Sequence, residues 1–138
     1  MRLTRWIILL SIAAFLPLFA HHGFQAEYDG SKIVFITGTL TKLDWTNPHI
    51  HFYVDAKDAD GKVTSWNFEG SATTLVERSG THRADLLANI GKEVTVRACP
   101  GRIVYTRGAA ETLKTADGQE LVVGGSRYKG GESTGSKQ

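Results

Sequence analysis

The feature that most constrains the fold is a change, and a later return, in the spacing of the apolar residues. Up to Phe68 apolar and polar residues alternate, and His49–Asp55 shows this most clearly. A period of two is typical of strands with one buried face. From Ser71 to Asn89 the apolar residues follow helical spacing, with Gly80 as an interruption, and afterwards the period of two returns. The pattern predicts a mainly β protein with one helical segment.

The order of the predicted elements points to a particular barrel. Strands are predicted at residues 33–45, 49–55, 63–68 and 92–98, followed by a hairpin of 111–114 and 120–123. A helical segment between strands three and four is the order of the oligonucleotide/oligosaccharide-binding (OB) barrel. Gly38, inside a long first strand, suits the bulge or bend that such a barrel needs there. We therefore predict a five-stranded OB-like barrel, with an open β-sandwich as the alternative.

The N-terminus has the pattern of a secretory signal peptide. Arg2 and Arg5 precede an apolar run over residues 6–19, and Ala20 supplies the small residue of a cleavage site. The run is short for a membrane span, which needs about 20 residues. We expect a periplasmic or secreted protein that begins at His21 and contacts the membrane only through the signal peptide during export.

Composition supports one exported domain without a nucleic-acid partner. Removal of residues 1–20 takes away two of the 16 basic residues, so the remaining basic residues balance the 14 acidic ones. Nothing in this charge balance favours a polyanionic partner. We predict a signal peptide at 1–20, an OB-like domain at 21–124, and a disordered tail rich in glycine, serine and lysine at 125–138.

Four of the five histidines fall in two close pairs. An N-terminal His21 would offer an amine and an imidazole to one metal ion, with His22 beside it. His49 and His51 lie two residues apart on a predicted strand, on one face and roughly 7 Å apart. The intervening arm is long enough to bring the pairs together. The pairs predict a site for copper or another divalent transition metal, and the alternative is solvent-facing strand residues and a mobile chain end.

A second candidate site is aromatic. Trp45, Tyr53 and Trp66 lie on or beside the strands that OB barrels use to bind sugars and bases. Both tryptophans could instead belong to the core of a small barrel. Two other residues are interpreted as structural. Cys99, the only cysteine, is predicted to be a passive buried thiol rather than a ligand or crosslink, and Glu69 a solvated strand end rather than a partner of a metal ligand.

Three segments resemble a known family. These are the His-His-Gly-Phe run, the stretch ending in Trp-Thr-Asn-Pro-His, and the turn Asp-Ala-Asp-Gly-Lys, at residues 21–24, 37–49 and 58–62. Together they are similar to an uncharacterised family of small exported proteobacterial proteins. The resemblance covers nearly the whole mature domain and implies a periplasmic barrel-like domain, but it implies no activity. Cys99 is not part of that pattern.

The sequence contains no recognised catalytic signature. It has no Gly-x-Ser-x-Gly, no His-Glu-x-x-His and no phosphate-binding glycine loop. We therefore expect a noncatalytic periplasmic binding module that holds copper or another divalent metal through His21, His22, His49 and His51. The first alternative is a metal-free OB-type module that binds a small molecule, glycan or protein partner. The second is a copper-dependent enzyme that uses the N-terminal histidine.

Overall fold

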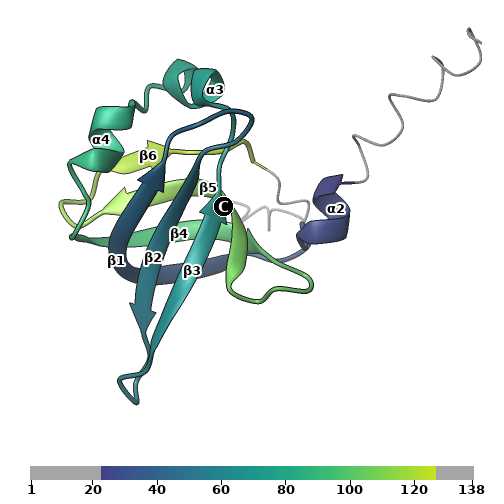
Figure 1. The fold of residues 1–138 in the computed structure, drawn as a ribbon, viewed down its shortest axis with the longest axis vertical. Helices are drawn as coiled ribbons and strands as arrows, with labels where there is room; N and C mark the ends of the chain where they lie inside the picture. Colours follow the sequence, from purple (N-terminus) through teal and green to yellow (C-terminus); the bar gives the residue numbers. More distant parts are fainter. Residues whose placement is uncertain (1–22, 127–138) are drawn as a thin grey trace, which may run out of the picture.

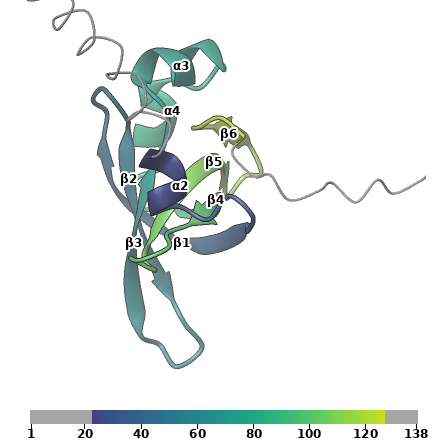
Figure 2. The ribbon, with the colours of Figure 1, turned by 90° about the vertical axis from the view of Figure 1, so that its right-hand side faces the viewer.

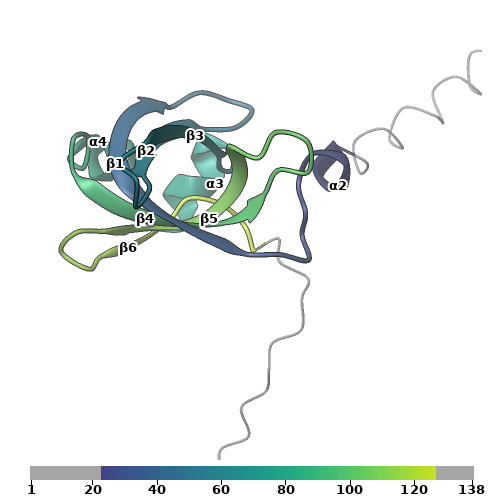
Figure 3. The same cartoon turned by 90° about the horizontal axis from the view of Figure 1, so that it is seen from below.

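Six strands of the described chain form one sheet that curls until it closes on itself (Figure 1). The computed structural model describes residues 23–126. The strands are β1 (Val34–Asp44), β2 (His51–Lys57), β3 (Val63–Glu69), β4 (Glu93–Pro100), β5 (Arg107–Thr115) and β6 (Glu120–Val122). The antiparallel order is β3-β2-β1-β4-β5-β6, and a parallel pairing between β3 and β5 closes five strands into a ring (Figure 3). The predicted five-stranded OB-like barrel is confirmed.

Two short helices between β3 and β4 cover one end of the barrel (Figures 1 and 3). They are α3 (Thr73–Arg78) and α4 (Arg83–Leu87), and they divide the predicted helical segment at Gly80, which has a φ of +92°. Val76 and Leu86 bury their side chains in the core. The exposed His82 stands at the N-cap of α4, where its backbone N–H donates to Asp85 Oδ2 at 2.7 Å.

The core follows the alternation read from the sequence. Ile50, Phe52 and Val54 are fully buried, and Phe52 stacks on Phe68 with ring centroids 5.5 Å apart. Their neighbours on the other face of β2 are half-buried or exposed. Hydrophobic burial on the barrel's inner face therefore determines which residues of β2 face outward, His51 among them.

The long first strand serves both halves of the barrel. β1 pairs with β4 along its first half and with β2 along its second half, and a bulge lies between Leu40 and Lys42. Gly38 stands at the crossing, where an added Cβ would overlap the backbone of Asp55. The predicted need for glycine is therefore a need for close approach between strands, and the bulge follows it by a few residues.

The fifth strand begins earlier than the sequence suggested. We predicted a strand from residue 111, whereas β5 starts at Arg107, pairs with β3 through its first residues and with β6 through its last. Gly108 permits this start, because a Cβ there would press against the ring of Phe68 at 2.9 Å. The early start places Arg107 beside the end of β3.

The residues before β1 form an N-terminal arm (residues 23–33) that lies against the outside of the barrel (Figure 2). It contains the one-turn helix α2 (Gly23–Glu27). Two backbone hydrogen bonds of 2.8 Å tie it to the end of β4, from Asp29 N to Pro100 O, and to the β4–β5 connection, from Arg102 N to Glu27 O. Tyr28, on the arm, is buried against Cys99 of β4, which is buried too.

The predicted signal peptide, His21 and His22, and all but the first two residues of the predicted tail lie outside the described residues. No helix within residues 23–126 is long and apolar enough to cross a membrane.

Candidate histidine pocket

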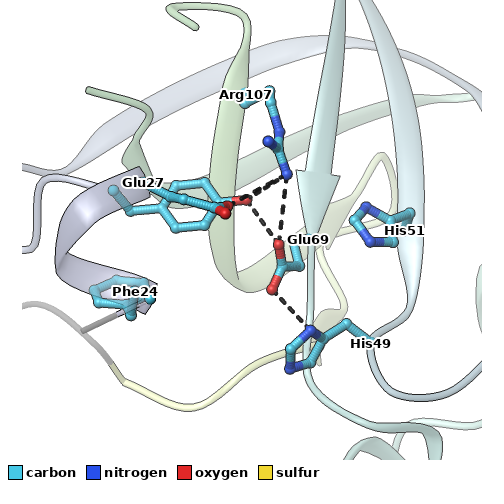
Figure 4. Close-up of a pocket in the computed structure, with 8 residues that line it drawn as sticks. Phe24, Glu27, His49, His51, Glu69 and Arg107 are labelled. Atoms are coloured by element: carbon cyan, nitrogen blue, oxygen red, sulfur yellow. Dashed lines mark hydrogen bonds and ion pairs between the residues drawn. The ribbon is translucent and has the colours of Figure 1, made fainter. Parts of the chain in front are cut away.

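A pocket of about 440 Å³ opens where the N-terminal arm meets the ends of β2, β3 and β5 (Figure 4). The residues that line it come from four separate segments: Gly23, Phe24, Glu27, Tyr28, His49, His51, Glu69 and Arg107. The barrel therefore brings the predicted strand pair of histidines together with the first described residue of the arm.

The two histidines reach the pocket in different ways. His51 begins β2, and the antiparallel register places it directly opposite Glu69 on β3. His49 precedes the strand, in the corner that follows β1, next to the cis peptide bond between Asn47 and Pro48. The corner before the histidine is held, because Asn47 Oδ1 accepts from the backbone N–H and hydroxyl of Thr73 at 3.2 and 3.0 Å.

Each histidine uses its Nδ1 atom for a hydrogen bond to an oxygen. His49 Nδ1 lies 2.9 Å from Glu69 Oε1, and His51 Nδ1 lies 3.2 Å from Asn67 Oδ1. Because carboxylate and amide oxygens accept, each Nδ1 carries the proton, and in a neutral ring the lone pair is then on Nε2. Metal-binding histidines in proteins show the same arrangement, in which the nitrogen away from the metal donates to an oxygen.

Glu69 is the central residue of the pocket (Figure 4). Its side chain is only 12% exposed, so the interpretation as a solvated strand end is wrong. The reason is tertiary: the N-terminal arm covers the end of β3, and the Tyr28 hydroxyl donates to Glu69 Oε2 at 2.8 Å. The carboxylate is therefore bound on one oxygen by the arm and on the other by His49.

Arg107 places a positive charge beside the two carboxylates of the pocket. Its Nη2 donates to the Tyr28 hydroxyl at 3.1 Å and lies 3.7 Å from both Glu27 Oε2 and Glu69 Oε2. Burial, followed by the hydrogen bond to Glu69, raises the pKa of Tyr28 above its ordinary value. Tyr28 is therefore a neutral phenol that donates to the carboxylate and accepts from the guanidinium.

The described side chains do not by themselves make a complete metal site. No group of three or more His, Cys, Asp and Glu side chains suited to a metal ion occurs in residues 23–126. The two histidines supply two nitrogens, and further ligands would have to come from another part of the chain. Gly23 lines the pocket, and His21 and His22, which precede it in the sequence, lie outside the described residues.

The structure does not bring the three candidate aromatic residues onto one face. Trp66 is the cross-strand partner of the buried Val54 and packs against the core, as Trp45 does. Tyr53 lies on the opposite face of β2, where Lys42 Nζ sits 5.0 Å from the centre of its ring. None of the three lines the histidine pocket.

Sequence reasoning did not identify Tyr28 or Arg107 as pocket residues. Tyr28 stood in an arm with no regular period, and Arg107 preceded the predicted strand. The one available signal was the small-residue run Gly-Ala-Ala after Arg107, which allows close strand packing. Cys99 is buried beneath the arm, in agreement with a passive thiol.

Fold and site together define a small OB-like barrel with a half-open histidine pocket beside its N-terminal arm. The chain belongs to a family of unknown function, DUF6152, whose model matches residues 8–110. The match confirms the resemblance to an uncharacterised family. No curated protein and no solved structure matches the chain.

Proposed function

We propose that the protein is an exported, noncatalytic binding module that holds a divalent transition metal, with copper(II) favoured, in the histidine pocket. His49 and His51 are two of the ligands, and His21 adds its amine and imidazole after removal of residues 1–20, with His22 beside it. The observation that carries the proposal is the pair of Nδ1 hydrogen bonds, to Glu69 and Asn67, which leaves two Nε2 lone pairs available in one pocket.

Copper(II) is favoured by the type of ligand. A set of imidazole and amine nitrogens binds divalent first-row metals with an affinity that is highest at copper. The chain has no methionine apart from Met1, and its single cysteine is buried, so soft sulfur ligands for copper(I) are not offered. An amine and an imidazole from one residue form a chelate, which lowers the ordering cost of binding.

A noncatalytic role is favoured by the state of the acid and base groups. Both oxygens of Glu69 accept hydrogen bonds from protein groups, and Tyr28 is held as a neutral phenol. General base catalysis needs a group that can take a proton from a substrate at working pH. Glu69 and Tyr28 are therefore not placed as general bases, and the available Nε2 atoms of His49 and His51 are assigned to the metal ion.

The test is copper(II) affinity, measured by competition calorimetry on the exported protein. We expect His21→Ala to weaken binding more than His51→Ala, because it removes the imidazole that forms a chelate with the N-terminal amine. Loss of an outer partner of a metal ligand already costs about 10–100-fold in affinity, so loss of His21 should cost at least that. One residue added ahead of His21 should also weaken binding, because it separates the amine from the imidazole.

His82→Asn is the matched control. It removes an exposed imidazole outside the pocket and keeps a residue that caps helices well, so affinity should not change. Binding of the wild type should weaken between pH 7 and pH 5, since protons compete with the metal for imidazole nitrogen. Equal affinity in wild type, His21→Ala, His51→Ala and the extended protein would overturn the proposal and favour the metal-free binding module.

A further inference from the structure

We propose that Tyr28 is a positioning residue that links docking of the N-terminal arm to the orientation of His49, so that metal binding and arm docking stabilise each other. The metal half of this inference rests on the proposed function. The half that concerns Tyr28 and His49 does not, because it can be measured in the metal-free protein.

The link runs through a single carboxylate. Tyr28, on the arm, donates to Glu69 Oε2 at 2.8 Å, and Glu69 Oε1 lies 2.9 Å from Nδ1 of His49. One oxygen thus belongs to the arm and the other to the histidine (Figure 4). A carboxylate held at one oxygen only can rotate, whereas one held at both presents a fixed acceptor to the imidazole. The hydrogen bond from Tyr28 therefore helps to fix the orientation of the His49 ring.

Arg107 does not replace Tyr28 in this role. Its Nη2 atom lies 3.7 Å from Glu69 Oε2, beyond hydrogen-bonding distance, whereas it donates to the Tyr28 hydroxyl at 3.1 Å. The guanidinium therefore orients the phenol, and the phenol orients the carboxylate. Loss of the phenol oxygen removes both contacts at once.

The same arm leads directly into the two predicted N-terminal ligands. Gly23 lines the pocket, and His21 and His22 precede it in the chain. An ion bound by His21 and by His49 would join the arm to the barrel, so it would favour the docked arm. Coupling between two binding events is reciprocal, and a docked arm must therefore raise metal affinity by the same factor.

Cys99 provides a reporter of arm docking. Its neighbour Ala98 points into the barrel core, whereas Cys99 belongs to a separate buried cluster with Ala109 and Tyr28. Phe24 and Ile33, both from the arm, pack against that cluster. Undocking of the arm would uncover the thiol. When docking and undocking are fast, the rate of Cys99 alkylation at constant pH therefore measures the undocked fraction of the protein.

The first experiment compares alkylation of metal-free wild type, Tyr28→Phe and Tyr53→Phe by iodoacetamide. A hydrogen bond contributes about 0.5–1.5 kcal/mol net, so Tyr28→Phe should alkylate about two- to tenfold faster. Tyr53→Phe is the matched control, since the structure gives its hydroxyl no hydrogen bond within residues 23–126, and its rate should equal that of wild type. Nitrogen NMR of the imidazoles gives a second readout: Tyr28→Phe should lower the Nδ1-protonated fraction of His49 and leave that of His51 unchanged.

Glu69→Gln provides a second variant should Tyr28→Phe fail to fold. A glutamine side chain has an amide nitrogen in place of one carboxylate oxygen, so Tyr28 and His49 cannot both donate to it in the way they contact Oε2 and Oε1 of Glu69. It should therefore either speed alkylation or change the His49 signals. Alkylation rates and His49 signals equal to those of wild type in the folded variants would overturn the link.

The second experiment adds zinc(II), which does not oxidise thiols, to the exported protein. Saturating zinc should slow alkylation of wild type, by up to about 100-fold at a free concentration 100 times the Kd. The His49→Ala/His51→Ala double variant should lose this protection, whereas direct binding of zinc to Cys99 would preserve it. Zinc binding without protection would overturn the coupling. Absence of zinc and copper binding, with the Tyr28 effects intact, would overturn the proposed function and leave the positioning role in place.

Discussion

At the scale of single residues, the pocket depends on which atoms are already occupied by hydrogen bonds. Glu69 and Asn67 each accept from a histidine Nδ1, and this determines which nitrogens remain available. Tyr28 matters in the same way, through one hydroxyl that donates to a carboxylate. Such roles are invisible in the residue type alone, because a glutamate at the end of a strand is more often solvated.

A residue-scale prediction concerns Asp29, which holds the turn that leads the arm into β1. Hydrogen bonds from the side chain and backbone of Ser31 lower the pKa of Asp29 to about 2 from an ordinary value of 3.8. A lowered pKa means that this turn is stabilised above about pH 3.8, and that the stabilisation is lost as pH falls through about 2. Ser31→Ala should move the titration of Asp29 back toward 3.8.

The measurement is carbon NMR of the Asp29 carboxyl from pH 6 to pH 1.5. Ser65→Ala is the control, because Ser65 is an exposed serine on β3 that does not contact Asp29. A wild-type midpoint near 3.8, or no difference between wild type and Ser31→Ala, would contradict the prediction.

At the scale of elements, the pocket exists because the last residue of one strand lies close to the first residue of another. β3 ends at Glu69 and β5 begins at Arg107, and their parallel pairing brings these residues to one edge of the barrel. The corner after β1 adds His49. Two hydrogen bonds that Thr73, at the start of α3, donates to Asn47 hold this corner against the helix. Strand pairing and corner geometry, rather than spacing along the chain, therefore bring the charged and titratable groups together.

An element-scale prediction is that Gly38→Ala destabilises the barrel. The added Cβ would overlap the carbonyl of Asp55, so β1 would have to move away from β2. Overpacking of this kind costs about 1–3 kcal/mol in the free energy of unfolding, and contact with backbone places this position at the upper end. Urea denaturation would measure the loss. Gly125→Ala, where a Cβ meets nothing within 4 Å, should leave the midpoint unchanged, and an equal midpoint for Gly38→Ala would show the argument to be wrong.

At the scale of the whole molecule, the barrel and the N-terminal arm have separate apolar clusters. The main core lies inside the barrel, whereas Tyr28, Cys99 and Ala109 form a small cluster on its outer surface. Undocking of the arm would therefore leave the contacts of the barrel core in place. This arrangement suits a chain whose first residues are proposed to complete a site.

A whole-molecule prediction concerns export. The exported protein should begin at His21, because the basic head, the apolar run and Ala20 have the pattern of a cleaved signal peptide. Intact-mass measurement of protein recovered from the periplasm, before and after chelation, reports both the cleavage site and any bound metal. Recovery of the full-length chain with Met1 in the membrane fraction would contradict the prediction and would remove the N-terminal amine from the proposed site.

The sequence by itself determined the order of strands and helical segment along the chain, and which residues of each strand face inward. These follow from local periodicity, since hydrophobic burial acts on every second residue of a strand. It also placed His51 on an outward face, whereas His49, expected on the same strand, lies in the corner before β2. Tertiary structure alone decided that the N-terminal arm covers Glu69 and that the Tyr28 hydroxyl donates to it. It also decided that β5 begins at Arg107, next to the end of β3. These contacts join residues 41 and 79 positions apart, and no local pattern encodes which distant strand ends will meet.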